Sequence, residues 1–135
     1  MPMITVRYVT PTPRPALQAK VAALAARLGA ECLGKDPMVT AVLAEAADPE
    51  SWFIAGRRPA IEDGKAAFWL DIKVTAGTNV KRETTAFIRA AFDGMADLLG
   101  PLHDESYVFV HCVDGDAYGY GGRTQNGRWA ANFPG

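Results

Sequence analysis

Pro2 is the residue with the clearest chemical potential, because it follows Met1 directly and opens a stretch of alternating β-type sequence. Initiator methionine is commonly removed before proline, and its removal would leave Pro2 with a free secondary amine. When neutral near pH 7, such an amine can take a proton from one atom of a substrate and return it to another. Proline also suits the first residue of a strand for purely structural reasons. Pro2 is therefore a candidate general base whose surroundings the rest of the chain must supply.

Four further side chains are candidates for binding a substrate beside such an amine. Lys73 could hold a negative charge, although Asp71 shares its strand face and could pair with it instead. Tyr107 and Tyr118 could donate hydrogen bonds to a carbonyl oxygen or pack in an interface. His111 could act as a second acid or base, or face a subunit contact as a structural histidine.

The composition is that of one globular domain and excludes several classes of partner. The chain has 135 residues, of which 49% are hydrophobic, and its 14 basic and 15 acidic side chains give a net charge of −1. This balance provides no attraction to nucleic acid or to an anionic membrane surface. No apolar run is long enough to cross a bilayer. We expect a single domain over residues 1–135 that binds neither nucleic acid nor membrane.

The cysteines and histidines do not form a metal-binding pattern. Cys32 and Cys112 lack metal-type spacing, and the two histidines are far apart. Cys32 falls late in a helical pattern and Cys112 within a strand pattern. We expect both to be small buried hydrophobic residues in a reducing cytoplasm, and we expect no bound metal.

The first half of the chain predicts a strand, a helix and a second strand. The strand covers residues 2–9, and the proline-rich segment 10–15 can only be a turn. Apolar residues at helical spacing predict a helix over 17–32. Residues 38–45 read as the second strand, and the aromatic stretch 52–56 suits a small hairpin or edge strand.

The second half repeats this order. Residues 57–65 form a polar connector, and strict alternation then predicts a strand over 68–75. A helical stripe follows over 79–99 and ends at Gly100-Pro101. Residues 107–113 alternate as the next strand, and a short aromatic, glycine-rich piece follows at 118–122.

Two tandem βαβ units are therefore predicted, over residues 2–58 and 67–123, with a tail over 124–135. The fold class is α+β, with a four-stranded mixed sheet and two helices on one of its faces. The other face also carries apolar residues, so we expect other copies of the chain to bury it. The tail is expected to lie along the surface or to reach a neighbouring subunit.

These features together resemble the tautomerase superfamily, and most closely its 4-oxalocrotonate tautomerase branch in the fused, double-length form. The resemblance spans Pro2 to about Arg123. It is carried by the strand opening Pro2-Met3-Ile4-Thr5-Val6, by Trp52-Phe53-Ile54-Ala55-Gly56 and by Tyr118-Gly119-Tyr120-Gly121-Gly122.

The resemblance implies a cytoplasmic, cofactor-independent isomerase, a tautomerase that interconverts keto and enol forms of a small oxo or enol carboxylic acid. It implies a homotrimer with Pro2 as the catalytic base. The second unit begins at Phe68, which is not proline, so one active site per chain is expected. Substrate-binding roles fall on Lys73, Tyr107, His111 and Tyr118.

Two alternatives stay open from the sequence. One is a hydratase, dehalogenase or decarboxylase acting on a short unsaturated or β-oxo acid. The family's dehalogenases and decarboxylase use arginine pairs, and this sequence shows no such pair at the corresponding positions. The other is a non-catalytic oligomeric binding protein that keeps the fold.

Overall fold

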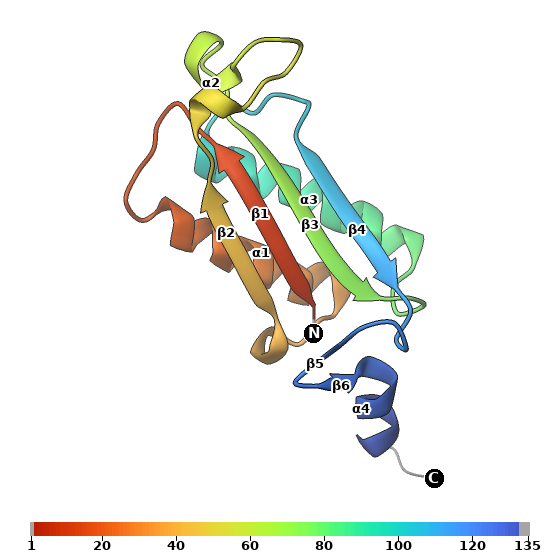
Figure 1. Cartoon of the computed structure of the whole chain (residues 1–135). Coiled ribbons are helices and arrows are strands. Elements are labelled where there is room, and N and C mark those ends of the chain that lie inside the picture. Colours follow the sequence, from red (N-terminus) through yellow and green to blue (C-terminus); the bar gives the residue numbers. More distant parts are fainter. Residues whose placement is uncertain (1, 133–135) are drawn as a thin grey trace.

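A four-stranded sheet backed by two helices forms the body of the protein (Figure 1). The structure, a computed structural model, describes residues 2–132; Met1 and the last three residues of the expected tail lie outside them. The strand order is β2-β1-β3-β4, with β1 and β3 antiparallel and the two outer pairs parallel. The strands are β1 (Met3–Val9), β2 (Ala41–Ala46), β3 (Ala67–Thr75) and β4 (Tyr107–Val113).

Helices α1 (Leu17–Leu33) and α3 (Lys81–Leu99) pack side by side on one face of the sheet (Figure 1). This arrangement confirms the α+β class and the mixed sheet with both helices on one side. The core lies between these layers, where alternate strand residues meet the apolar stripes of the helices. Its largest fully buried members include Ile4, Leu17, Phe68, Leu70, Ile72, Phe87, Met95 and Leu99.

Local sequence explains where α1 ends and where α3 begins, through the hydrogen bonds that cap them. Gly34 ends α1 with φ 68°, and the N–H groups of Gly34 and Lys35 donate to carbonyls of the last turn. At the start of α3, the Glu83 carboxylate accepts the Val80 N–H at 2.9 Å and an Asn79 amide N–H at 3.2 Å. These hydrogen bonds lower the pKa of Glu83 below its usual value.

The face of the sheet away from the helices is uncovered within one chain and carries large apolar side chains, as the sequence predicted, beside charged ones such as Asp71 and Lys73. Its strands alternate, so each buried residue has an outward-facing neighbour. Large apolar side chains on this open face are a third to a half exposed: Met3, Leu43, Trp69, Tyr107 and Phe109.

Equivalent points in the two halves stand 66 positions apart. Gly34 and Gly100 end the two long helices, and Ala41 and Tyr107 begin β2 and β4. By the same spacing, Phe68 matches Pro2. The spacing also relates the tight turn at Ile54–Arg57 to the one between β5 (Gly119–Tyr120) and β6 (Arg123–Thr124).

Three segments differ from the sequence prediction. The expected strand 38–45 begins later, because Asp36 accepts the Met38 N–H and the chain forms the 3-10 turn η1 (Pro37–Val39) before β2. The connector contains the one-turn helix α2 (Pro59–Glu62), and a second 3-10 turn, η2 (Pro49–Ser51), precedes it. The tail forms helix α4 (Gln125–Asn132), which lies with β5 and β6 beyond the end of the sheet (Figure 1). We call residues 114–132 the C-terminal lobe.

The cysteine prediction is wrong for Cys112. Both cysteines are free, but only Cys32 is partly buried, whereas Cys112 near the end of edge strand β4 is exposed. Among the described residues, no helix is long and apolar enough to cross a membrane.

Candidate functional site

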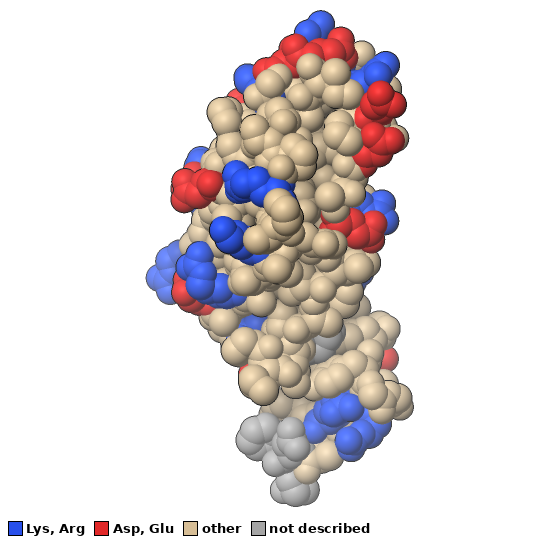
Figure 2. Space-filling view, turned by 90° about the vertical axis from the view of Figure 1, so that its left-hand side faces the viewer, with Lys and Arg blue, Asp and Glu red and all other residues tan. Residues whose placement is uncertain are grey.

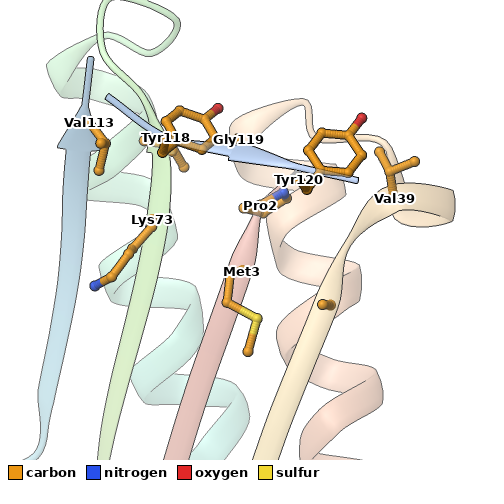
Figure 3. A pocket seen from close by; sticks show the side chains of 10 residues that line it. Pro2, Met3, Val39, Lys73, Val113, Tyr118, Gly119 and Tyr120 are labelled. Carbon is orange, nitrogen blue, oxygen red and sulfur yellow. The ribbon is translucent and has the colours of Figure 1, made fainter. Parts of the chain in front are cut away.

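A cavity of about 410 Å³ opens at the end of the sheet where β1 begins, and Pro2 forms part of its wall. The cavity lies between the strand ends and the hairpin β5–β6, which crosses above the start of β1 (Figure 3). Its lining is mostly apolar and comes from Pro2, Met3, Val39, Ala41, Lys73, Val74, Val113, Tyr118, Gly119 and Tyr120. We call it the Pro2 cavity.

The pairing of the strands fixes the backbone of Pro2. Its carbonyl accepts the Ala41 N–H at 3.1 Å, which extends the parallel pairing of β1 and β2 by one residue. The ring is buried and follows the alternation of Ile4 and Val6, which face the helices. A rigid strand end therefore holds the Pro2 ring at the wall of the cavity.

Tyr118 and Tyr120 form the wall opposite the strand ends (Figure 3). Two glycines with positive φ, Gly121 at 61° and Gly122 at 81°, make the tight turn that folds this hairpin back on itself. The Tyr118 hydroxyl is hydrogen-bonded to the Thr75 hydroxyl at the end of β3. This contact ties the hairpin to the sheet and places a polar group at the cavity wall.

Lys73 lines the Pro2 cavity, but its amine is already paired. Its Nζ lies 3.0 Å from Asp71 Oδ1, and Figure 3 shows the side chain pointing towards β4 and away from Pro2. His111 Nε2 lies 2.8 Å from Asp71 Oδ2, so one carboxylate binds both candidates on the open face of the sheet. The pairing of Lys73 with Asp71 is the structural alternative that the sequence left open.

Tyr107 lies at the opposite end of the sheet from Pro2. It begins β4, which runs parallel to β3 and antiparallel to β1, so its start is remote from the start of β1. Its hydroxyl donates to the Glu105 carboxylate, and this hydrogen bond raises the pKa of Tyr107. The structure thus brings Pro2, Lys73 and Tyr118 together and leaves Tyr107 and His111 outside the cavity.

Tyr107 lines a second, more open depression of about 540 Å³, which we call the far pocket. Shifting the Pro2 cavity by the 66-position spacing between the two halves leads to this pocket. It lies beside the turn at Ile54–Arg57, which we call the first hairpin, and beside the start of β4. Its lining consists of Trp52, Phe53, Ile54, Ala55, His103, Glu105 and Tyr107.

Sequence reasoning missed Val39 and Tyr120 as parts of the cavity. Val39 was expected inside a strand, and the 3-10 turn η1 places it at the cavity instead. Tyr120 could have been found, because it follows Tyr118 by two residues and so shares its side of the hairpin. Among the described residues, no three His, Cys, Asp or Glu side chains meet as in a metal site.

The cavity can accept a small organic molecule with its reactive atoms beside the ring of Pro2. Its mostly apolar lining offers contact surface to a ligand, and the few polar groups that line it would orient that ligand. The residues with polar side chains that line it are Lys73, Tyr118 and Tyr120.

The fold is that of fused 4-OT structures. No family model and no curated protein matches the chain. A structure described as a fused 4-OT wild-type symmetric trimer matches with a TM-score of 0.79 at 14% sequence identity, covering 93% of this chain and 98% of that one.

Two further structures have the same fold. Pt0534, described as inactivated by 2-oxo-3-pentynoate, matches with a TM-score of 0.78 at 12% identity and covers 92% of this chain and 96% of that one. A macrophage migration inhibitory factor-like protein from Entamoeba histolytica matches with a TM-score of 0.73 at 14% identity, covering 91% of this chain and 97% of that one. The sequence-based resemblance to a fused tautomerase is thus confirmed at the level of the fold.

Proposed function

We propose that the chain is a cofactor-independent tautomerase in which the amine of Pro2, freed by removal of Met1, moves a proton within a small enol or 2-oxo carboxylic acid. The observation that carries this proposal is the place of Pro2 at the wall of a mostly apolar cavity, at the start of a central strand. The fold shared with fused 4-OT structures supports it, as does the inactivation of Pt0534 by a 2-oxo acid.

The proposed step is the ketonisation of an enol acid. Apolar surroundings favour the neutral form of an amine, which can then accept the proton of the enol hydroxyl. As the C=O bond forms, the neighbouring carbon takes a proton from the protonated amine. The amine of Pro2 ends the cycle in its starting form, so no cofactor or co-reactant is consumed.

Negative charge develops on the substrate oxygen during this transfer, and a hydrogen-bond donor at the cavity wall would stabilise it. We assign this role to the Tyr118 hydroxyl, with Lys73 as a neighbouring cation. Tyr107 lies at the other end of the sheet from Pro2, and His111 is beside Lys73 in the sheet but does not line the Pro2 cavity, so neither receives a role in this mechanism.

The proposed assembly is a homotrimer. The uncovered apolar face of the sheet needs a partner, and a structural neighbour is described as a symmetric trimer. Burying side chains such as Trp69 and Phe109 against other copies would remove a large apolar area from water.

The test compares the processed protein with Pro2→Ala. The mass of the intact protein first establishes whether Met1 is absent, since a retained Met1 would block the amine. Ketonisation of phenylenolpyruvate is then followed for both proteins, and the proposal expects the variant to lose most of the activity. Equal activity of the two proteins would remove Pro2 from the mechanism.

A further inference from the structure

Arg128 of helix α4 lies against the wall of the Pro2 cavity. Its Nε donates to the Tyr120 carbonyl at 2.9 Å, and its guanidinium carbon lies 4.0 Å from the centre of the Tyr120 ring. Tyr120 and Gly119 both line the cavity. The guanidinium is therefore held at two points, directly beside the segment that forms the cavity wall.

Glycine at position 121 makes this placement possible. A Cβ atom at Gly121 would stand 2.3 Å from Arg128 Nη2, and the backbone there has φ 61°, which favours glycine. The turn thus leaves room for the guanidinium to lie flat against the hairpin.

Within residues 2–132, no ion pair neutralises the charge of Arg128. Among the described residues, no Asp or Glu carboxylate lies within 4.0 Å of its guanidinium, whereas the amine of Lys73 is paired with Asp71. Arg123 and Arg128 are the only Lys or Arg residues of the C-terminal lobe, and Figure 2 shows a group of blue atoms on that lobe.

The far pocket differs from the Pro2 cavity in having acidic side chains at or beside it. The position that corresponds to Arg128, 66 residues earlier, is Glu62, and Glu105 lines the far pocket itself. Arg57 beside it is held by Asp63 through a hydrogen bond at 2.7 Å. A cation is also near the far pocket, since Arg58 lies 5.3 Å from the centre of the Phe53 ring, but there it has acidic neighbours.

We infer that Arg128 sets the preference of the Pro2 cavity for anionic substrates, so that a carboxylate binds there better than the matching ester. This inference rests on the proposed function and adds to it. It names Arg128, which lies outside the four strands and two long helices, as the residue that makes the cavity prefer a negatively charged substrate. The Arg128 guanidinium would attract a substrate carboxylate across the Tyr120 segment of the wall. Charges interact more strongly in such apolar surroundings than in water. The attraction works mainly through charge, because the Nε is already engaged by the Tyr120 carbonyl.

The test is equilibrium binding measured by titration calorimetry, with 2-oxopentanoate and its methyl ester as probes. The wild-type protein is expected to favour the acid, and Arg128→Gln to lose about 10-fold in affinity for the acid but not for the ester. Arg128→Lys keeps the charge and should stay within about threefold of the wild type. Rising salt should weaken acid binding in the wild type and leave Arg128→Gln nearly unaffected.

The matched control is Arg89→Gln, since Arg89 also lies over an aromatic ring, that of Phe92, but on α3 away from the cavity. The inference is overturned if Arg128→Gln keeps the acid preference, if Arg89→Gln loses as much, or if the wild type shows no preference. Repeating the titration in Pro2→Ala separates the two claims. An Arg128-dependent preference that persists there stands even where the proline chemistry fails.

Discussion

The two ends of the sheet share one architecture and differ in their side chains. At one end, Pro2 begins the sheet segment beneath the hairpin β5–β6, beside the Pro2 cavity. At the other end, Phe68 takes the matching position in β3, and its ring is fully buried at 6.5 Å from that of Phe92. The Phe68 N–H is an ordinary amide that faces Ser106 Oγ at 3.3 Å. A position that can offer a free amine in one half serves the core in the other.

The two hairpins and the depressions beside them differ in the same way. The far pocket keeps its hairpin and its depression, but it is lined by Glu105 and His103 and contains no terminal amine. The first hairpin packs Trp52 and Ile54 on a small core with Val9, Ala60 and Ala67. The C-terminal hairpin is followed by the eight-residue helix α4, which brings Arg128 against the ring of Tyr120.

The largest expected effect is a difference in catalytic activity between variants at the matched positions Pro2 and Phe68. Pro2→Ala should lower kcat for ketonisation by about 10²- to 10⁴-fold, the usual contribution of a positioned base. Phe68→Ala should leave kcat per folded molecule nearly unchanged, because the ring lies in the core and not in the Pro2 cavity. Steady-state kinetics on both variants checks this, and equal losses would break the contrast.

The free energy of unfolding should fall more in Phe68→Ala than in Pro2→Ala, the reverse of the order expected for activity. Phe68→Ala removes a fully buried ring and should lower the free energy of unfolding by about 3–5 kcal/mol. Pro2→Ala removes far less buried volume and should cost clearly less. Urea unfolding followed by circular dichroism measures both, and a larger loss for Pro2→Ala would show that the proline serves mainly the fold.

Assembly should depend on the open face of the sheet and not on its helical face. Trp69→Asp puts a charge among the apolar side chains of the open face and should shift the protein from three chains to one of 14.5 kDa. Ile88→Asp on the exposed side of α3 is the control and should leave the assembly intact. Size-exclusion chromatography with light scattering distinguishes these outcomes, and a trimer that survives Trp69→Asp contradicts the proposed interface.

The smallest expected effect concerns acid sensitivity in the two long helices. The pKa of Glu83 is lowered by its hydrogen bonds at the start of α3, whereas the first turn of α1 has no acidic residue. A lowered pKa in the folded state stabilises the protein above the ordinary value of 4.5, and this contribution is lost as pH falls through the folded-state pKa. Glu83→Gln should therefore reduce the stability lost below about pH 4.5, as urea midpoints measured from pH 3 to 7 would show. An unchanged pH profile would mean that Glu83 does not contribute.

Much of the fold could be predicted because its periodic signals are strong. Alternation over 107–113 gave the bounds of β4, and glycines ended both long helices where expected. The segment 125–132 did not predict helix α4, because it is short, contains Gly127 and has only Trp129, Ala130 and Ala131 as apolar residues.

The site was harder to predict because it depends on which strand ends meet. Pro2 and Tyr118 both line the cavity, as predicted. Tyr107, also predicted to bind the substrate, does not line it. Since β1 and β3 are antiparallel, the end of β4 lies near Pro2 and its start does not. Arg128 gave no signal at all, because only the folded lobe brings it against Tyr120.

The most direct test of the central claim is covalent labelling with 2-oxo-3-pentynoate, the compound named as the inactivator of the structural neighbour Pt0534. This acetylenic 2-oxo acid accepts a nucleophilic amine at its triple bond. Mass spectrometry of the intact and digested protein should show one molecule bound per chain at Pro2, and none in Pro2→Ala. Labelling confined to the exposed thiol of Cys112, or a Pro2→Ala variant labelled as fast as the wild type, would contradict a reactive amine in the Pro2 cavity.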